Sequence, residues 1–213
     1  MRPRKFTDPA YLRAFREIIA RIGRGLGDSP ARMYVAGGAA VHFYTGVRIS
    51  EDIDAAFSRR IVPGEALEVS YTDAEGAPRL LYFDTQYNES FALVHEDAHD
   101  DSIPLAIPGM GRNPVEVRLF SPLDLAVSKL ARFAEHDRED IRALASAGLI
   151  EARSLRRRAE AALAAYVGDT RKIKTSINLA CEIVRKARRI ATSRAASRPA
   201  ARRSSRRRAG RGR

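Results

Sequence analysis

The pattern of apolar and polar residues changes twice along this chain of 213 residues. Over residues 9–24 apolar side chains recur every three or four positions, which predicts an amphipathic helix that ends in the segment GRGLGDSP. Between residues 33 and 119 the apolar residues come in short β-prone runs separated by Gly, Pro and Asp: MYVAG, DIDAAF, ALEVSY, RLLYFDTQY, FALVHE and VEVRLF. Such runs are typical of strands, so we expect a small mixed sheet behind the N-terminal helix.

Helical spacing returns after residue 120. Ser121 and Pro122, with an acid at position 124, form a strong helix start, because serine caps the first N–H groups and proline suits the first helical position. This helix is predicted to end at Gly148 and to carry on adjoining turns Leu125, Lys129, Arg132 and His136. Two further helices are predicted from apolar residues at helical spacing: Leu155, Ala159, Ala162, Leu163 and Tyr166 in the first, and Ile173, Ile177, Ala180 and Val184 in the second.

These elements predict an α+β fold in two parts, followed by a tail. A small mixed β-sheet core with its N-terminal helix is expected over residues 1–120, and a C-terminal helical bundle over residues 121–190. Residues 191–213 hold nine arginines and no acid, so the rest of the chain carries only +3 of the net charge of +12. We expect this basic tail to be disordered, because it has little to bury. Binding to nucleic acid phosphates and simple solubilisation explain it equally well.

Composition narrows the class of protein. No apolar run approaches the roughly 20 residues that span a bilayer. The basic start MRPRKF leads into DPAYLRAF instead of an apolar segment with a cleavage site, so we expect no signal peptide, no membrane partner and a cytoplasmic location. The single cysteine, Cys181, excludes an intrachain disulfide and a cysteine cluster for structural zinc. Its apolar neighbours predict a small buried side chain.

The strongest chemical signal is GGAAVHFYTGVRISEDIDAAF, residues 37–57. On a strand, Asp52 and Asp54 would point to one side, roughly 7 Å apart at the backbone, while Ile53 points into the core. Two unpaired carboxylates repel each other, and a divalent cation such as Mg²⁺ relieves that repulsion. Gly37 and Gly38 follow a short strand and open a helix, where backbone N–H groups can approach an anion with no Cβ in the way. Phosphate and metal would meet between the two elements.

This order of residues resembles the nucleotidyltransferase superfamily, in which a strand, a glycine pair, a helix and a strand with Asp-x-Asp form the catalytic core. More narrowly, Gly-Gly-x-Ala … Arg-x-Ser-x-Asp-Ile-Asp is similar to the pattern of abortive-infection type nucleotidyltransferase toxins and of related bacterial proteins of undefined function. A second block, SPLDLAVSKLARFAEHDREDIRAL, resembles theirs too, with His136 where they carry an arginine. The resemblance covers residues 33 to about 145.

The resemblance implies roles for further residues. Asp52 and Asp54 would hold Mg²⁺ or Mn²⁺ with a third carboxylate, and the three would act in catalysis. For that third acid we prefer Asp84, at the end of an apolar run in RLLYFDTQY, and keep Glu116 in VEVRLF as the reserve. The nucleoside triphosphate would be held by Gly37, Gly38, Ser50 and Lys129.

Each of these residues also has a structural explanation. Alternating acids can form the solvated face of an edge strand, a glycine pair can form a tight turn, and a lysine can lie along a wet helix face. The segment Arg48-Ile49-Ser50 ahead of the acid pair favours the metal site. For Asp137 and Asp140 we favour the structural role, as caps of the next helix turn or partners of Arg138 and Arg142.

The sequence therefore predicts metal-dependent transfer of a nucleotidyl group from a nucleoside triphosphate to a hydroxyl of an RNA, such as tRNA, or of a protein. By resemblance, the chain would be the toxin of a toxin–antitoxin or phage-defence system with a cognate antitoxin. Two other classes stay open: a non-catalytic RNA-binding module on the same fold, and an interaction protein that acts by contact. The acid pair is expected on an inner strand, with Asp84 converging on it beside the glycine turn.

Overall fold

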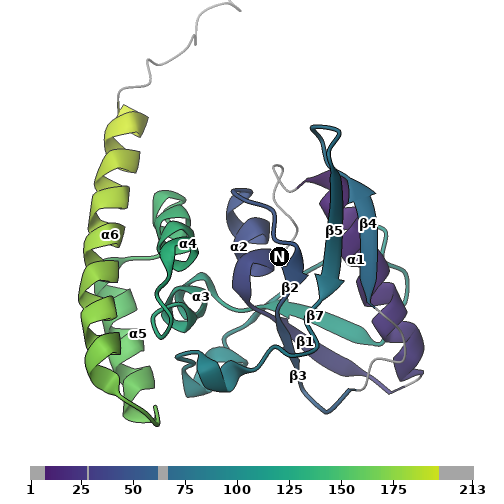
Figure 1. Ribbon diagram of the computed structural model, residues 1–213, viewed down its shortest axis with the longest axis horizontal. Coiled ribbons are helices and arrows are strands. Elements are labelled where there is room, and N and C mark those ends of the chain that lie inside the picture. Colours follow the sequence, from purple (N-terminus) through teal and green to yellow (C-terminus); the bar gives the residue numbers. More distant parts are fainter. Residues whose placement is uncertain (1–7, 28, 62–66, 197–213) are drawn as a thin grey trace, which may run out of the picture.

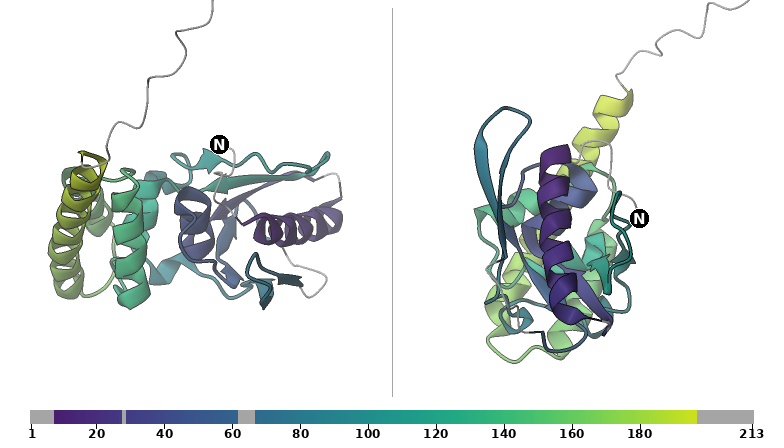
Figure 2. Two further views of the ribbon diagram at one scale, coloured as in Figure 1. Left: turned by 90° about the horizontal axis from the view of Figure 1, so that it is seen from above. Right: turned by 90° about the vertical axis from the view of Figure 1, so that its right-hand side faces the viewer.

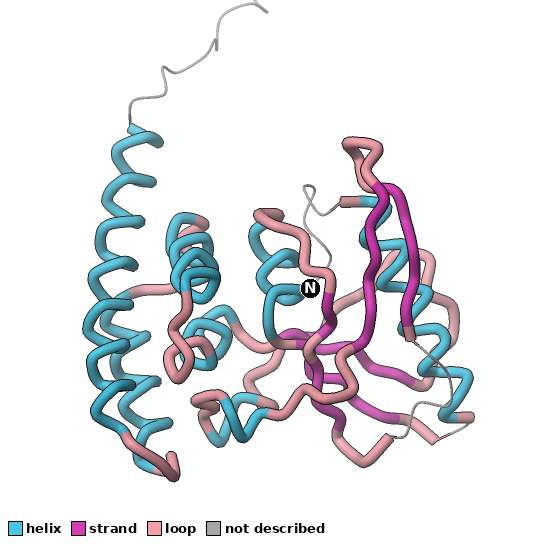
Figure 3. Tube along the Cα trace, viewed as in Figure 1, coloured by secondary structure: helices cyan, strands magenta, loops and turns pink. Residues whose placement is uncertain are grey.

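The computed structural model describes residues 8–27, 29–61 and 67–196, which contain helices and two small sheets (Figure 1). In chain order the elements are α1 (Pro9–Leu26), β1 (Ala31–Val35), α2 (Gly37–Thr45), β2 (Asp52–Ile53), β3 (Ala55–Phe57), β4 (Glu68–Thr72), β5 (Pro78–Phe83), the 3₁₀-helices η1 (Glu89–Phe91) and η2 (Glu96–Ala98), β6 (Ile103–Pro104), β7 (Val115–Leu119), α3 (Pro122–Ser128), α4 (Glu135–Ser146), α5 (Ala152–Ala164) and α6 (Thr170–Ala196). The strands gather in one half of the molecule and α3–α6 in the other (Figure 3). The predicted α+β class is confirmed.

The two sheets meet at the segment that carries the acid pair. In one sheet β1 lies between antiparallel β3 and parallel β7, and β6 pairs with β7. In the other, β5 lies between parallel β2 and antiparallel β4. The expected single inner strand is therefore wrong, because residues 52–57 form the edge of one sheet as β2 and then the edge of the other as β3. The backbone carbonyl of Ile53 accepts from the N–H of Asp84, and that of Asp54 accepts from the N–H of Ala36 on the opposite side.

Helix α1 confirms the N-terminal prediction and ends two residues later than expected. The Oδ1 atom of Asp8 caps its first turn by accepting hydrogen bonds from the N–H groups of Ala10 (2.7 Å) and Tyr11 (2.8 Å), and Pro9 takes the first helical position. The apolar face of the helix packs on β4 and β5 (Figure 2). Its buried residues include Phe15, Ile18, Ile19 and Ile22.

The single helix predicted from Ser121 to Gly148 is wrong, because the chain forms two helices, α3 and α4. The start is confirmed: Ser121 Oγ accepts a hydrogen bond from the N–H of Asp124 (3.1 Å). In one straight helix Lys129 and Asp140 would lie roughly 16 Å apart along the axis. In the structure Lys129 Nζ lies 2.7 Å from Asp140 Oδ2. The break between the helices therefore allows a buried ion pair that a continuous helix forbids.

Both further helices are confirmed, as α5 and α6. The predicted apolar face of α6 is buried; in the first helix Leu155, Ala159 and Ala162 are buried, whereas Leu163 is half-buried and Tyr166 lies beyond the end of α5. Helix α6 continues to Ala196, so residues 191–196, which the sequence assigned to the tail, are helical. The remaining part of the predicted tail, residues 197–213, lies outside the described residues.

The run FALVHE does not form the predicted strand. Residues 92–95 are irregular and connect η1 to η2. Side chains satisfy the backbone locally here, because Asn88 accepts from the N–H of Ser90 and His95 accepts from the N–H of Asp97. Such bonds compete with the hydrogen bonds of a sheet. Leu93 still contributes to the core.

One continuous apolar core joins the sheets, α1 and the C-terminal helices. Cys181 is buried in it, as predicted. In the described part of the chain, no helix combines the length and the apolar character that crossing a membrane requires.

Candidate active site

Asp52 and Asp54 lie where the chain passes from β2 into β3. Ser50 Oγ donates a hydrogen bond to Asp52 Oδ1 at 2.5 Å, which orients that carboxylate. Asp54 is anchored through its backbone, because its carbonyl accepts from the N–H of Ala36 (2.9 Å) immediately before α2. The acid pair is thereby held against the turn that starts the helix.

Close approach of the chain requires both glycines of this turn, Gly37 next to Asp54 and Gly38 next to Ser50. Gly37 has a φ of 58°, in the left-handed region that favours glycine. A Cβ atom at Gly37 would overlap Asp54 Oδ2, and one at Gly38 would lie 2.5 Å from Ser50 Oγ. The helix start also has no side-chain cap, since Ala36 occupies the N-cap position. Asp54 therefore lies beside the glycine turn, as predicted.

A cleft of about 510 Å³ opens in front of the acid pair. The elements around it, β2, α2 and the connection between α3 and α4, lie next to one another in the middle of the molecule (Figure 1). The lining residues are Gly37, Gly38, Arg48, Ser50, Asp52, Asp54, Asp84, Gln86, Tyr87, Asn88, Ala92, Ser128, Lys129, Arg132, His136 and Asp137. All seven residues predicted to bind metal or nucleotide are among them.

Of the two candidates for the third acid, Asp84 lies in the cleft and Glu116 does not. Asp84 follows β5, and its Oδ1 accepts a hydrogen bond from the N–H of Gln86 (2.8 Å). Glu116 lies on β7, where it pairs with Arg118 (2.7 Å) and Arg32 (3.2 Å) and is 47% exposed. Only Asp84 can therefore act together with the acid pair.

Ionisation of Asp54 is unfavourable in this setting. Burial, followed by the charges of Asp52 and Asp84, raises its pKa from 3.8 to about 6. Lys129 and Arg132 act in the opposite direction but do not cancel the effect. Additional positive charge would therefore be stabilised on this side of the cleft.

The opposite side of the cleft is basic, and its cations are held by two buried acids. Lys129 is only 7% exposed, and its Nζ lies 2.7 Å from Asp140 Oδ2 and 3.8 Å from Asp137 Oδ1. It is therefore not a lysine on a wet helix face. Arg132 donates two hydrogen bonds to Asp137, at 2.9 and 2.8 Å, yet 73% of its side chain is exposed. Arg132 can thus reach a ligand while its guanidinium stays anchored.

The structural interpretation of Asp137 and Asp140 is right about their kind of role and wrong about their partners. Asp137 caps the start of α4 by accepting from the N–H of Ala134 (2.9 Å). Burial opposes its ionisation, but the hydrogen bonds from Arg132 and from Ala134 lower its pKa below the ordinary value. Neither acid forms an ion pair with Arg138 or Arg142 in the described part of the chain; their partners come from the cleft instead.

The lining residues that were not assigned to the site from the sequence include Arg132, Arg48 and the loop after β5. Arg48 lies 3.4 Å from Asp140 Oδ2 and has a φ of 42°. It belongs to the Arg-x-Ser pattern before the acid pair, and this pattern was a signal for it. The loop after β5 contributes Gln86, Tyr87 and Asn88. No motif marks this loop, because its place depends on where β5 ends.

The cleft fits a metal that is shared with a phosphate better than one held by the protein alone. No group of three or more His, Cys, Asp or Glu side chains is arranged to hold a metal ion within the described ranges. Asp84 is turned toward the N–H of Gln86, so the three carboxylates share a cleft without converging on one point. Mg²⁺ commonly takes one or two carboxylates and completes its shell with substrate phosphates and water. Asp52 and Asp54, beside the glycine turn, suit that arrangement.

Comparison with known proteins gives one finding. No curated protein and no solved structure matches the chain. A family profile described as "Nucleotidyltransferase of unknown function (DUF6036)" matches residues 13–188, which include every residue of the cleft. Because this match spans most of the chain, the protein belongs to the DUF6036 family of nucleotidyltransferases of unknown function.

Proposed function

We propose that this protein transfers a nucleotidyl group from a nucleoside triphosphate to a hydroxyl group in a metal-dependent reaction. The observation that carries the proposal is the contact between the glycine turn and the acid pair, where a Cβ at Gly37 would overlap Asp54. Uncapped N–H groups and two carboxylates on one side, and Lys129 and Arg132 on the other, are the groups that a metal-bound triphosphate needs. Their chemistry supports the proposal independently of the family match.

The residues on the two sides of the cleft would hold the triphosphate in different ways. The N–H groups of Gly37 and Gly38 would donate hydrogen bonds to phosphate oxygens, without a side chain in the way. Arg132 would donate from the part of its guanidinium that faces solvent. Lys129 would stay paired with Asp140 and contribute a fixed positive field, because its ammonium is buried.

Mg²⁺ or Mn²⁺ held by Asp52 and Asp54 would neutralise charge on the phosphate oxygens. In the reaction, the acceptor oxygen forms a bond to the α-phosphorus, the bond from that phosphorus to the bridging oxygen of the β-phosphate breaks, and pyrophosphate leaves. The hydroxyl proton passes to a carboxylate on the acid side. Asp84 is the proposed base, because its Oδ2 accepts no hydrogen bond from any described residue.

For the acceptor we propose an RNA, such as tRNA, with a protein hydroxyl as the alternative. The similarity of residues 37–57 to abortive-infection toxins extends the proposal to a toxin role with a cognate antitoxin. Expression of the protein should then arrest growth, and Asp54→Asn should abolish the arrest. Growth arrest by Asp54→Asn as strong as by wild type would instead support an interaction protein that acts by contact.

Isotope transfer tests the proposed reaction. The protein is incubated with Mg²⁺, total RNA or protein extract, and each of the four nucleoside triphosphates labelled on the α-phosphate. Asp52→Asn and Asp54→Asn should each lower the rate on the order of a thousandfold, because charge stabilisation worth several kcal/mol is lost. A rate for Asp54→Asn equal to that of wild type would contradict catalysis at this cleft, and binding without transfer would favour the non-catalytic RNA-binding module.

The same assay decides the third acid with a matched pair of variants. Asp84→Asn removes an acid inside the cleft, whereas Glu116→Gln removes one on the surface of β7. We expect a large loss for the first and nearly full activity for the second. The reverse result would return Glu116 to the site.

A further inference from the structure

Charge is divided unevenly along this chain. Residues 1–151, which contain the cleft, hold 18 Lys or Arg and 23 Asp or Glu, a net charge of −5. Residues 152–196, which form α5 and α6, hold 12 Lys or Arg and 3 acids, a net charge of +9. The basicity of the described protein therefore lies on its two C-terminal helices, in addition to the arginines that follow them.

Three cations of α6 face away from the rest of the molecule. Lys172, Lys186 and Arg189, here called the outer basic face, fall within roughly 100° of one another around the helix. They lie opposite the buried side of α6, which packs on α4 and α5. That buried side consists of Ile173, Ile177, Ala180, Val184 and Ala187. The helix forms one end of the molecule in two perpendicular views (Figures 1 and 2), so nothing else in the described structure covers this face.

The outer basic face is also electrostatically unsatisfied. All three of its side chains are exposed, and none forms an ion pair with another described residue. Glu182, the only acid on α6, also falls on this face by its helical position and is exposed, but it forms no ion pair with a described residue, so the face keeps an excess of two positive charges. The ion pairs of α6 are made instead by Arg171, with Asp169, and by Arg188, with Glu151. Three free cations over roughly 25 Å of rigid helix suit a ligand with repeated negative charge.

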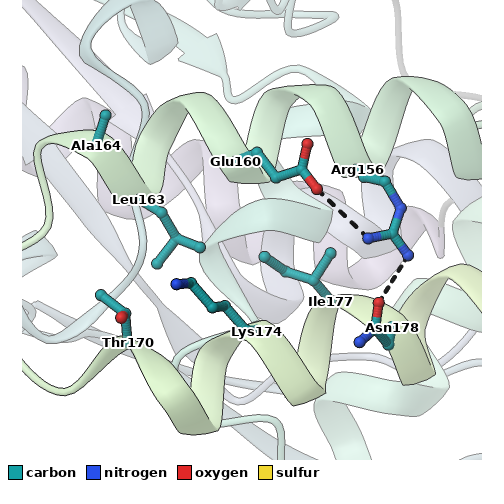
Figure 4. A pocket seen from close by; sticks show the side chains of 8 residues that line it. All are labelled: Arg156, Glu160, Leu163, Ala164, Thr170, Lys174, Ile177 and Asn178. Atoms are coloured by element: carbon teal, nitrogen blue, oxygen red, sulfur yellow. Dashed lines mark hydrogen bonds and ion pairs between the residues drawn. The ribbon is translucent and has the colours of Figure 1, made fainter.

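The neighbouring groove between α5 and α6 adds one further cation. It measures about 600 Å³, and Figure 4 shows Arg156 across it, bonded to Glu160 (3.4 Å) and Asn178 (2.7 Å). Lys174 lies along the same groove with no ion pair to a described residue. Lys174 therefore adds a free cation next to the outer basic face, whereas Arg156 is already bound to partners within the groove.

An anionic membrane is a poor partner for this helix. An amphipathic helix binds a bilayer by burying its apolar face in the lipid. The apolar face of α6 is already buried against α4 and α5, and only Leu179 and Ile190 are large exposed apolar residues on it. A polyphosphate backbone needs no apolar contact, because cations alone supply its sequence-independent attraction.

One exposed arginine lies between α6 and the cleft. Helix α4 separates α6 from α2 (Figure 1) and carries the exposed Arg142. Arg142 lines a cavity of about 540 Å³ together with Arg48, which lines the cleft as well, and with the acids Glu139 and Asp140. Arg48 is paired with Asp140 (3.4 Å), so Arg142 is the cation of this cavity that a polyanion reaching from α6 toward the acid pair would meet unpaired.

We propose that the outer basic face of α6 binds the phosphate backbone of RNA. The choice of RNA rests on the proposed function, because RNA supplies both the repeated phosphates and an acceptor hydroxyl. The surface holds the acceptor by charge and leaves its reacting end to the cleft. Because α6 is packed from Ile173 to Ala187 on two other helices, its cations keep a fixed spacing.

Two triple variants of the full chain test the proposal. Lys172→Gln/Lys186→Gln/Arg189→Gln removes the outer basic face. The matched control, Arg13→Gln/Arg60→Gln/Arg112→Gln, removes three exposed arginines that also lack an ion pair with a described residue but lie on the other half of the molecule. Both variants lower the net charge by three. Affinity for a fluorescent RNA hairpin with a single-stranded 3′ end is measured between about 50 and 200 mM salt.

The α6 variant should lose affinity on the order of tenfold at low salt, and its plot of log K against log salt should be shallower by about two to three. The control should keep the wild-type slope. Equal slopes for the two variants, whether lowered or unchanged, would overturn the proposal, because net charge or another surface would then account for binding. Equal affinity for a DNA duplex of the same length would overturn the assignment to RNA.

Failure of this inference can be separated from failure of the proposed function. Asp54→Asn should bind the hairpin as tightly as wild type, and the α6 variant should keep wild-type affinity for Mg²⁺-bound nucleoside triphosphate. Normal hairpin binding without nucleotidyl transfer would refute only the reaction. If the α6 variant transferred the nucleotidyl group at the wild-type rate and bound RNA with wild-type affinity, only the binding surface would be refuted.

Discussion

Cations in the cleft and cations on α6 are held in opposite ways. Lys129 is buried between Asp137 and Asp140, and Arg132 is fixed by two hydrogen bonds to Asp137. Lys172 and Lys186 on α6 are exposed and unpaired within the described structure. Buried pairs fix the position of a charge at the cost of desolvation, whereas exposed charges act on a partner through the field and the salt concentration.

This difference indicates which of the two proposed functions needs accurately positioned charges. Nucleotidyl transfer requires the attacking and leaving oxygens to be aligned, and misplacement by 1 Å can cost a hundredfold in rate. Holding a long polyanion requires only several cations on one surface. Substitutions in the cleft should therefore change rates and stability strongly, and substitutions on α6 should change salt-dependent binding with little effect on either.

The largest effect on activity outside the carboxylates is expected at the glycine turn. Gly37→Ala forces a Cβ against Asp54 in a backbone conformation that alanine rarely adopts. The turn or the acid must shift, and we expect the rate of nucleotidyl transfer to fall at least on the order of a hundredfold. Steady-state transfer of labelled nucleotide measures it.

Gly25→Ala is the matched control for that substitution. Gly25 lies within α1, and a Cβ there would meet nothing within 4 Å. Alanine in a helix is favoured over glycine by about 0.5–1 kcal/mol, so this variant should be slightly more stable and fully active. If Gly37→Ala also kept wild-type activity, close contact between the turn and the acid pair would not matter for the reaction.

Lys129 and Lys172 should differ in how much they contribute to the stability of the protein. Lys129→Gln leaves Asp137 and Asp140 buried without their ammonium partner, and removal of one member of a buried pair costs roughly 3–5 kcal/mol. Lys172→Gln removes an exposed, unpaired cation and should change the free energy of unfolding by less than about 0.5 kcal/mol. Urea denaturation of both variants measures the difference.

The double variant Lys129→Met/Asp140→Leu separates charge from packing. Replacing a whole buried pair by apolar residues is often neutral, so it should recover much of the stability lost in Lys129→Gln. Its transfer activity should stay low, because the ammonium that lines the cleft is gone. Equal stability losses for Lys129→Gln and Lys172→Gln would remove the proposed contrast between the two regions.

Substitution of Asp54 is expected to have a smaller, pH-dependent effect on the free energy of unfolding. Burial, then the charges of Asp52 and Asp84, raise its pKa from 3.8 to about 6, so the folded protein binds this proton more tightly than the unfolded chain does. In metal-free protein the corresponding stability is fully present below about pH 4 and is lost as the pH rises through about 6. Asp54→Asn should thus be more stable than wild type by about 3 kcal/mol at pH 7.5, and by little at pH 4.

Urea denaturation in EDTA at both pH values measures this difference. Addition of Mg²⁺ should narrow it at pH 7.5, because the ion stabilises only the wild-type carboxylate. If wild type were more stable than Asp54→Asn at pH 7.5 in EDTA, ionisation of Asp54 would not be unfavourable in the folded protein.

The acidic half of the cleft could be predicted from the sequence, because its parts lie close together along the chain. Gly37, Gly38, Asp52 and Asp54 fall within 18 residues, and a helix and a turn bring them together. Their order is a motif because the local geometry depends on few other contacts. The strand-to-strand switch at Asp54 could not be predicted, since it depends on hydrogen bonds to Ala36 and Asp84 from distant segments.

The contacts of the basic half of the cleft, in contrast, could not be predicted from the sequence. Helical periodicity alone continues smoothly from Ser121 to Gly148 and gives no sign of the break between α3 and α4. The break allows Asp140 to meet Lys129 and Arg48, and these contacts exist only in the folded chain. Periodicity reports which face is apolar, but it does not report where buried charges need to meet.

The smallest effect on stability is expected from removal of residues 197–213. This segment consists of Ser, Arg, Pro, Ala and Gly, with eight arginines and no acid, so its loss removes almost no large apolar group. The free energy of unfolding should stay within about 0.5 kcal/mol of wild type, and the transfer rate to a short RNA acceptor should not change. RNA affinity at low salt should fall and should converge on that of wild type as salt rises, because screening weakens the contribution of the arginines.

Truncation after residue 182 is the control for this deletion, because it also removes the buried Val184 and Ala187 from α6. It should destabilise the protein by on the order of 3 kcal/mol through lost packing, in contrast to the shorter deletion. The shorter deletion also tests whether residues 197–213 or α6 make the phosphate contacts with RNA. If it abolished the salt dependence of RNA binding altogether, the phosphate contacts would lie in residues 197–213, and the outer basic face of α6 would have no part in holding the acceptor.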